Sequence, residues 1–299
     1  MIVSSTPSPR SQRLQADLTL LLVALIWGIA FVAQRVAALS MSTYIFNGAR
    51  FMLAVLVLLP FVWQGRASLR NWGWRHVGGV SLAGVLMFAG ATLQQEGLRF
   101  TTATNAGFIT GLYVVFIPLL LAFVWRQPPP RLTWAAALVA ISGLYLLSTG
   151  GSIHFALGDL LELICALMWA LHVIVIGRLV NLTGALNLVV GQNIVCGMLS
   201  LALGAVVDPD AWQAIPAAWL PVLYTGVFSV GIGYTLQAYA QRTAPASDAA
   251  IILSLEAVFA ALGGWLLLSE RLAPLQLFGC GLMLAGMLLV QLKAYTQIK

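Results

Sequence analysis

The sequence predicts an all-α polytopic membrane protein in which ten transmembrane helices form two inverted five-helix repeats. Its composition, its apolar segments and an internal repeat lead to this fold class. Of its 299 residues, 61% are hydrophobic and 8% are charged, whereas a soluble domain carries about 25% charged residues. So few charges could not cover a surface that faces water, so we expect lipid as the solvent. Apolar runs of about 20 residues favour helices over the shorter, alternating strands of a barrel.

Ten apolar segments can be placed along the chain: 18–38, 43–63, 77–98, 102–125, 132–149, 157–180, 185–207, 218–241, 246–268 and 275–292. Short connections separate them, and one contains three consecutive prolines that cannot continue a helix. The segment 150–156 lies midway and is the predicted boundary between two halves. We therefore expect a disordered cytoplasmic tail over residues 1–13, a first five-helix repeat over 14–150 and a second, inverted repeat over 151–299.

A phrase of polar residues occurs twice and indicates that the halves are related. TLQQEGLR begins at Thr92, and TLQAYAQR begins at Thr235, which is 143 residues later. At similar offsets Trp27 matches Trp169 and Gly48 matches Gly191. Because five segments, an odd number, separate equivalent positions, the second copy crosses the membrane in the opposite direction. Such an inverted pair has two nearly equivalent conformations, one open to each side, so we expect alternating access.

The basic residues predict the orientation. With the N-terminus inside, eleven of the 15 Lys and Arg residues fall on the cytoplasmic side, three fall outside, and Arg50 lies within a segment. Cytoplasmic loops carry such an excess. We therefore expect a multi-pass protein of the cytoplasmic (inner) membrane of a bacterium, with both termini in the cytoplasm.

Three stretches carry a family resemblance. LSLEAVFAALGGWLLLSERL, from Leu253, and TTATNAGFITGLYVVFIPLL, from Thr101, resemble the ninth and fourth helices of the EamA family in the drug/metabolite transporter superfamily. NGARFMLAVLVLLP, from Asn47, is similar to the second helix of that family. The resemblance spans both halves. It implies a basket of helices around a central cavity, with the fifth and tenth helices peripheral.

The resemblance also implies carriers of small polar metabolites, of which amino-acid exporters are the best-known kind. The chain departs from the family pattern in two places. Gln127 stands where the second half has Glu270, so the first half lacks that acidic end. Ala257 stands where many members have proline, so we expect a straighter ninth helix.

Aromatic and amide side chains within the segments are the first candidate substrate contacts. Trp27 and Trp169 lie mid-segment at equivalent positions, whereas tryptophan is commoner at membrane interfaces. His172 shares a helical stripe with Trp169, and also with Glu162. Gln94 and Gln237 occupy equivalent places in the repeated phrase, which would build a polar hairpin at each mouth of a pathway. The alternative for the tryptophans and His172 is a packed face between helices with satisfied polar groups, and the alternative for the two hairpins is ordinary helix capping.

Two charges lie deep within segments, where each costs about 2.5–3.5 kcal/mol on insertion scales. Arg50 could bind a substrate carboxylate, or it could clamp backbone carbonyls or pair with Glu256. Glu256 could bind an ammonium group or a coupling proton. Its counterpart in the first half is Tyr113, so the fold does not require the charge twice. Tyr113 is therefore included as a candidate substrate contact.

Other classes of function fit the sequence less well. Neither a protease motif nor a nucleotide-binding loop occurs, so we expect no enzyme and no primary pump. The three histidines and three cysteines show no metal-ligand spacing, and we expect neither a metal nor a cofactor. The scattered basic residues argue against nucleic acid as a partner. The predicted function is a secondary transporter of small polar metabolites, most simply an amino-acid exporter, with a flippase for lipids or other amphiphiles as the alternative.

Overall fold

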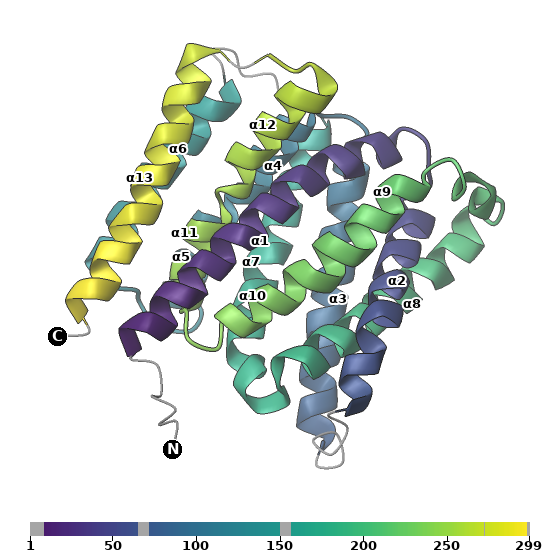
Figure 1. Cartoon of the computed structure of the whole chain (residues 1–299), viewed down its shortest axis with the longest axis horizontal. Coiled ribbons are helices and arrows are strands. Elements are labelled where there is room, and N and C mark those ends of the chain that lie inside the picture. The colour runs from purple at the N-terminus through teal and green to yellow at the C-terminus, as the bar shows by residue number, and fades with distance from the viewer. Residues whose placement is uncertain (1–8, 65–71, 150–156, 272, 298–299) are drawn as a thin grey trace, which may run out of the picture.

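The computed structural model describes residues 9–64, 72–149, 157–271 and 273–297, which form helices and no strand (Figure 1). The helices are α1 Pro9–Ala38, α2 Thr43–Gln64, α3 Trp74–Gly97, α4 Ala103–Gly111, α5 Tyr113–Phe123, α6 Arg131–Thr149, α7 Leu157–Thr183, α8 Ala185–Val207, η2 Ala211–Ala214, α9 Trp219–Tyr224, η3 Thr225–Gly233, α10 Tyr234–Ala240, α11 Ala246–Leu253, α12 Glu256–Leu268 and α13 Pro274–Gln297.

The consecutive pieces α4–α5, α9–η3–α10 and α11–α12 follow three of the predicted segments, so the helices match the ten segments in order. Within the described residues, eight helical stretches are long and apolar enough to cross a membrane. The other two apolar helices, Arg131–Leu146 and Pro274–Leu289, are shorter. Ten crossings therefore stay a prediction, whereas an all-helical chain with several spans is confirmed.

The first helix begins earlier than predicted. Residues 9–13 belong to α1, so this part of the expected disordered tail is helical, while residues 1–8 lie outside the described residues. The guanidinium group of Arg13 forms ion pairs with Asp17 and Asp248, each at 3.0 Å. These contacts tie the first turns of α1 to α11 and explain why the helix extends beyond its apolar run.

Equivalent helices of the two halves pack against each other in opposite directions. In the α2–α8 pair, Gly48 lies against Leu201, and Gly204 lies against Ile45, so residue numbers rise on one helix as they fall on the other. The α6–α13 pair is antiparallel in the same way and lies at the edge of the bundle (Figure 1). The peripheral place of the fifth and tenth helices agrees with the family resemblance.

The remaining contacts recur between the halves. The contacts of α1 with α11 and α12 have their counterparts in the contacts of α7 with α4 and α5. The contact between α3 and α7 has its counterpart in those of α1 with α9, η3 and α10. This pattern, with the two antiparallel pairs, fits a pseudo-two-fold axis perpendicular to the long helices.

Two helices are interrupted at equivalent positions. Leu112 separates α4 from α5 with φ −62° and ψ −10°, and Leu255 precedes α12 with φ −62° and ψ −12°. The expectation of a straighter ninth helix was therefore wrong. The break needs no proline, because the amide of Ala257 bonds to the carbonyl of Ser254 and the Ser254 hydroxyl donates to Ile251, which tightens the turn.

The eighth helix differs from its counterpart, the third. Its middle is a π-helical segment, η3, which contains three glycines, whereas α3 is α-helical throughout. Such widened turns are rare and frequently occur at functional sites. Here η3 lies beside α1 and α2 and contributes to the central cavity described below.

Candidate functional site

A small cavity of about 40 Å³ lies between the two interrupted helices. The structure brings all eight predicted side chains to its wall: Trp27, Arg50, Gln94, Tyr113, Trp169, His172, Gln237 and Glu256. A water molecule needs about 10–15 Å³ of such space, and metabolite pockets are about 300–1,000 Å³. The cavity therefore has room for a few waters, and it must widen to hold a metabolite.

Both halves contribute to this wall through equivalent positions, 142 or 143 residues apart. Six such pairs line the cavity: Trp27 and Trp169, Ala30 and His172, Phe31 and Val173, Gln94 and Gln237, Thr110 and Leu253, and Tyr113 and Glu256. The cavity therefore lies on the pseudo-two-fold axis. Each position, however, carries different chemistry in most pairs, so the site itself is asymmetric.

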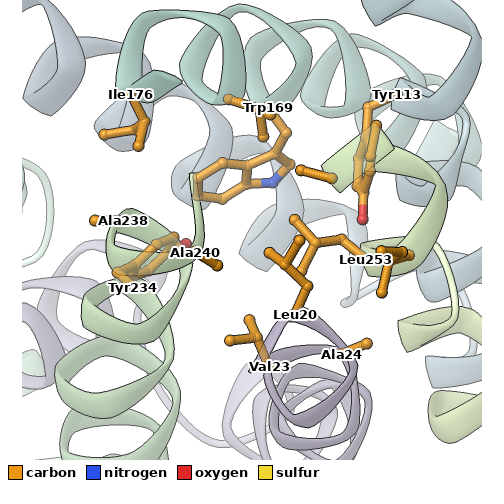
Figure 2. Close-up of a cluster of buried hydrophobic side chains, with 14 of the residues drawn as sticks. Leu20, Val23, Ala24, Tyr113, Trp169, Ile176, Tyr234, Ala238, Ala240 and Leu253 are labelled. Carbon is orange, nitrogen blue, oxygen red and sulfur yellow. The ribbon is translucent and has the colours of Figure 1, made fainter. Parts of the chain in front are cut away.

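Aromatic rings form one part of the wall. The Tyr234 ring lies 4.9 Å from that of Trp27 and 6.0 Å from that of Trp169, measured between centroids. The indole nitrogen of Trp27 donates to the carbonyl of Ser229 in η3, at 3.0 Å. In Figure 2, Trp169, Tyr234 and Tyr113 surround a common space from three different helices. Such a wall would suit the apolar part of a ligand.

Equivalent glycines support the two tryptophans. A Cβ atom at Gly233 would lie 2.6 Å from the indole nitrogen of Trp27, and one at Gly90 would lie 3.1 Å from the Trp169 ring. Gly90 and Gly233 are 143 residues apart. Each indole thus packs directly on the backbone of the opposite half, with no room for a side chain at Gly233 and a tight fit for one at Gly90.

Arg50 is buried and held by neutral groups. Its Nη1 donates to Oε1 of Gln34 at 2.7 Å, and its guanidinium carbon lies 5.1 Å from the ring centroids of both Phe46 and Phe51. Cation–π contacts of this kind stabilise a desolvated guanidinium. The ion pair with Glu256 that the sequence left open is not formed.

Glu256 faces the cavity from the first residue of α12. It is 3% exposed, and its Oε1 has no hydrogen-bond partner. The hydroxyl of Tyr113 and Nε2 of Gln237, both at the same wall, also have no partner in good hydrogen-bond geometry, and the Tyr113 hydroxyl lies next to the Glu256 carboxyl. Buried polar atoms are nearly always paired, so these three atoms are available to a ligand or to water.

The other polar candidates have protein partners. Nε2 of His172 lies 3.0 Å from Oε1 of Gln192, and the imidazole meets the Trp169 ring edge-on. Nε2 of Gln94 donates to the hydroxyl of Thr110 over a long 3.4 Å, and that hydroxyl donates to Glu162 at 2.9 Å. Glu162 itself is fully buried and does not line the cavity, although Trp169 and His172 of its stripe do.

A vestibule opens at the face where α1 begins and α13 ends, which we call the terminal face. It has a volume of about 520 Å³ and is lined by the end of α5, the second half of α7 and the connection between α10 and α11. Nε2 of Gln241, in its wall, donates to the carbonyl of Val173, in the wall of the cavity, at 3.0 Å. Vestibule and cavity are therefore neighbours.

At the other end of the helices, which we call the opposite face, side-chain contacts close the region between α4 and α12. A separate pocket of about 440 Å³ lies beside it, along the α1–α2 connection and the ends of α3 and α8. The hydroxyl of Thr104 bonds to the carboxylate of Glu270, and Arg35 donates to the carbonyl of Leu98. The counterparts of Thr104 and Glu270 are Ser247 and Gln127, which both line the vestibule.

Sequence reasoning missed nine of the lining residues, and those among them with polar side chains are Tyr234, Gln34, Thr110 and Ser229. The counterparts of Tyr234 and Gln34 are Ala91 and Ile176, so the repeat gave no sign of them. Ser229 accepts the hydrogen bond of Trp27 with its backbone carbonyl, and a backbone contact cannot be predicted from the type of side chain.

Known proteins resemble this chain over nearly its whole length. An uncharacterised transporter of Archaeoglobus fulgidus is 38% identical over 282 residues, 94% of this chain and 87% of the relative. The threonine/homoserine exporter RhtA of Escherichia coli K12 is 26% identical over 245 residues, 79% of this chain and 78% of the relative. An S-adenosylmethionine/S-adenosylhomocysteine transporter of Chlamydia muridarum is 26% identical over 295 residues, 92% of this chain and 91% of the relative.

The fold also has a solved counterpart. A crystal structure with 19% sequence identity superposes with a TM-score of 0.77 and covers 94% of this chain and 98% of the other. The sequence matches the same family twice, over residues 14–149 and 156–292. One match in each half, together with the paired contacts of the two halves, shows that the chain belongs to the EamA-like transporter family.

Proposed function

We propose that the chain is a secondary transporter that exports small metabolites carrying an α-amino-acid group. The observation that carries this proposal is that Arg50 and Glu256 line one cavity without pairing with each other. A guanidinium group can take a carboxylate, and a carboxylate can take an ammonium group. An amino acid presents both groups, and the rings of Trp27, Trp169 and Tyr234 would take its side chain.

The names of two relatives support this chemistry. Threonine, homoserine, S-adenosylmethionine and S-adenosylhomocysteine all contain an α-ammonium and an α-carboxylate group. Their remaining parts differ in size and polarity. The shared amino-acid group is therefore the part that Arg50 and Glu256 would recognise, and the aromatic wall would set the preference among side chains.

Alternating access would carry the ligand across. The terminal face has a vestibule where the opposite face has the contact between Thr104 and Glu270, and this difference supports alternation between two related states. With ten crossings and both ends in the cytoplasm of a bacterial inner membrane, the vestibule would face the cytoplasm. An exporter would load its substrate from that side.

Counterflow in proteoliposomes tests the proposal. Vesicles preloaded with one unlabelled solute would be offered the same labelled solute, in a panel of amino acids, nucleosides, sugars and polyamines. We expect uptake for amino acids with the α-ammonium and α-carboxylate free, and none for their amides or N-acetyl forms. Uptake confined to another class, or movement of a lipid headgroup instead, would overturn the proposal.

Variants of the two charges sharpen this test. Glu256→Gln and Arg50→Lys keep most of the shape but lose the charge or the planar fork. Loss of one partner of a buried charge pair costs about 2–5 kcal/mol, so Glu256→Gln should lower counterflow at least about 30-fold. Arg50→Lys keeps the charge and loses only the bidentate geometry, so its effect should be smaller. Glu96→Gln removes a carboxylate from the surface end of α3 and serves as the matched control. Equal rates in Glu256→Gln and in this control would contradict the assignment.

A further inference from the structure

Glu162 is a second buried carboxyl that the proposed substrate site does not use. It lies on α7, 0% exposed, one layer away from the cavity. Its Oε2 accepts a hydrogen bond from Thr110 at 2.9 Å, and its Oε1 has no hydrogen-bond partner. A buried carboxyl with a free oxygen is costly unless it has a function or a partner.

The fold itself does not require this carboxyl. The equivalent residue of the first half is Leu20, which is also fully buried. An apolar leucine therefore fills the equivalent buried position in the other repeat. Burying the carboxyl of Glu162 there costs more free energy than burying an apolar side chain of similar size.

No cation neutralises Glu162 in the described residues. The ionisable groups around it are Asp159 and Cys165 on its own helix and Glu256 on α12, while α4 has no ionisable side chain. Just after the end of α3, Arg99 is half exposed and pairs with Glu96. An isolated carboxylate in such a place costs several kcal/mol, so the neutral, protonated form fits this conformation.

The space at the free oxygen suits a proton and not a metal ion. A Cβ atom at Gly97 would lie 2.8 Å from Oε1 of Glu162, so the backbone of α3 packs directly against it. Protein sites for hard cations use about six oxygen ligands. Only Thr110 supplies a side-chain oxygen bonded to Glu162 here.

Thr110 links Glu162 to the substrate cavity. It lines the cavity, and it lies next to the break between α4 and α5. On the other side of that break Tyr113 faces Glu256 across the same cavity. A change at the break can therefore alter the surroundings of both carboxyl groups together.

We propose that Glu162 is the proton-binding site of a proton/substrate antiporter, distinct from the substrate site at Arg50 and Glu256. This inference rests on the proposed function. Glu162 lies near the opposite face, close to Gly97 and Asp159 at the ends of α3 and α7. When that face opens, one proton binds to the carboxylate as substrate leaves. The state seen here, open at the terminal face, still holds this proton, which leaves as substrate binds from that face.

Two transport assays separate the proton site from the substrate site. Counterflow at equal pH needs only substrate exchange, whereas accumulation driven by a pH gradient needs coupling. We expect Glu162→Gln to retain counterflow within about twofold and to lose accumulation at least tenfold, as should Glu162→Leu, the residue of the other repeat. Glu96→Gln should retain both. Normal accumulation in Glu162→Gln, or equal loss of both activities, would overturn the inference.

A measurement without transport keeps the inference separate from the proposed function. Infrared difference spectra of the purified protein, recorded across a pH range, report protonated carboxyl groups directly. We expect one carbonyl band that is absent in Glu162→Gln and present in Glu256→Gln, and that shifts in Thr110→Val. A spectrum unchanged by Glu162→Gln would contradict the proton site, even if the chain exports amino acids. If the band appears as expected but no amino acid gives counterflow, the proposed function would be contradicted and the proton site would not.

Discussion

The terminal and opposite faces are built from equivalent residues, yet the ends of the two interrupted helices line a vestibule at one face and bond to each other at the other. The pocket of about 440 Å³ at the opposite face lies beside this contact. At the opposite face Thr104 bonds to Glu270, and Arg35 bonds to the end of α3. At the terminal face the counterparts Ser247, Gln127 and Gly177 line a vestibule of about 520 Å³. The helices contact one another in the same pattern on both sides, so the difference lies in the ends of a few helices and in their side chains.

This difference has a cause in the sequence as well as in the conformation. The opposite face has a long cation, Arg35, where the terminal face has Gly177, and it has Glu270 where the terminal face has Gln127. Charged hydrogen bonds are stronger than neutral ones. Closure should therefore be more stable at the opposite face, which favours the state seen here.

A disulfide that fixes the closed face should have the largest effect. A Cβ atom at Gly264 would lie 3.1 Å from the hydroxyl oxygen of Thr104, which suits a disulfide between Thr104→Cys and Gly264→Cys after the flexible Glu270 moves aside. Oxidation should abolish transport, and reduction should restore it. The native cysteines are buried, which limits background reaction. Full transport by the oxidised protein would show that this face need not open.

Filling the vestibule should have the next largest effect. Gly177→Arg places at the terminal face the residue that the opposite face has at Arg35. A guanidinium bond to a carbonyl contributes about 1.5–3 kcal/mol, so closure should be favoured about tenfold or more. A cysteine at Asn181 should then react more slowly with water-soluble thiol reagents. Gly177→Ala is the control, and equal labelling in both would refute this reason for the open vestibule.

Weakening the closed face should have a smaller effect. Glu270→Gln keeps a hydrogen bond to Thr104 but removes its charge, which costs about 1 kcal/mol. The opposite face should open about fivefold more often, measured as faster labelling of a cysteine at Asn105. The terminal-face change Gln127→Glu is the matched comparison and should leave that labelling unchanged. A slower reaction in Glu270→Gln would contradict the role of this bond.

The glycines beneath the two tryptophans should give the smallest effect. Alanine at Gly233 would meet Trp27 at 2.6 Å, whereas alanine at Gly90 would meet Trp169 at 3.1 Å. The overpacking at Gly233 should lower stability by about 1 kcal/mol, while the helix preference of alanine offsets most of the milder contact at Gly90. Thermal unfolding of the purified variants measures the difference. The reverse order would mean that the two halves support their tryptophans differently.

The repeat explains how much of the site could be predicted. Residues with recognisable counterparts, such as the two tryptophans and the two glutamines, were found from the sequence, and the structure gathers them at one cavity. Tyr234 was missed because its counterpart is Ala91. The hydrogen-bond partner of Arg50 could not be predicted, because Gln34 lies on another helix and its counterpart, Ile176, is apolar.

The features of the fold that the sequence did not predict are confined to single turns and short segments. The helices followed from runs of apolar residues, but the start of α1 depends on ion pairs of Arg13 that only the packed helices create. The break before Glu256 depends on backbone hydrogen bonds rather than on a proline. The π-helical segment η3 has an apolar sequence that an α-helix would equally satisfy.

Reciprocal cross-linking of the two faces tests the central claim most directly. Leu121 and Ser247 both line the vestibule and are the counterparts of Gly264 and Thr104. Rates of disulfide formation would be compared for the pairs 104/264 and 121/247, with and without the amino acid that gives counterflow. The account predicts that the 104/264 pair reacts faster without substrate, and that substrate slows this pair while it speeds the 121/247 pair. Rates that change in the same direction in both pairs, or in neither, would contradict alternation between the two faces.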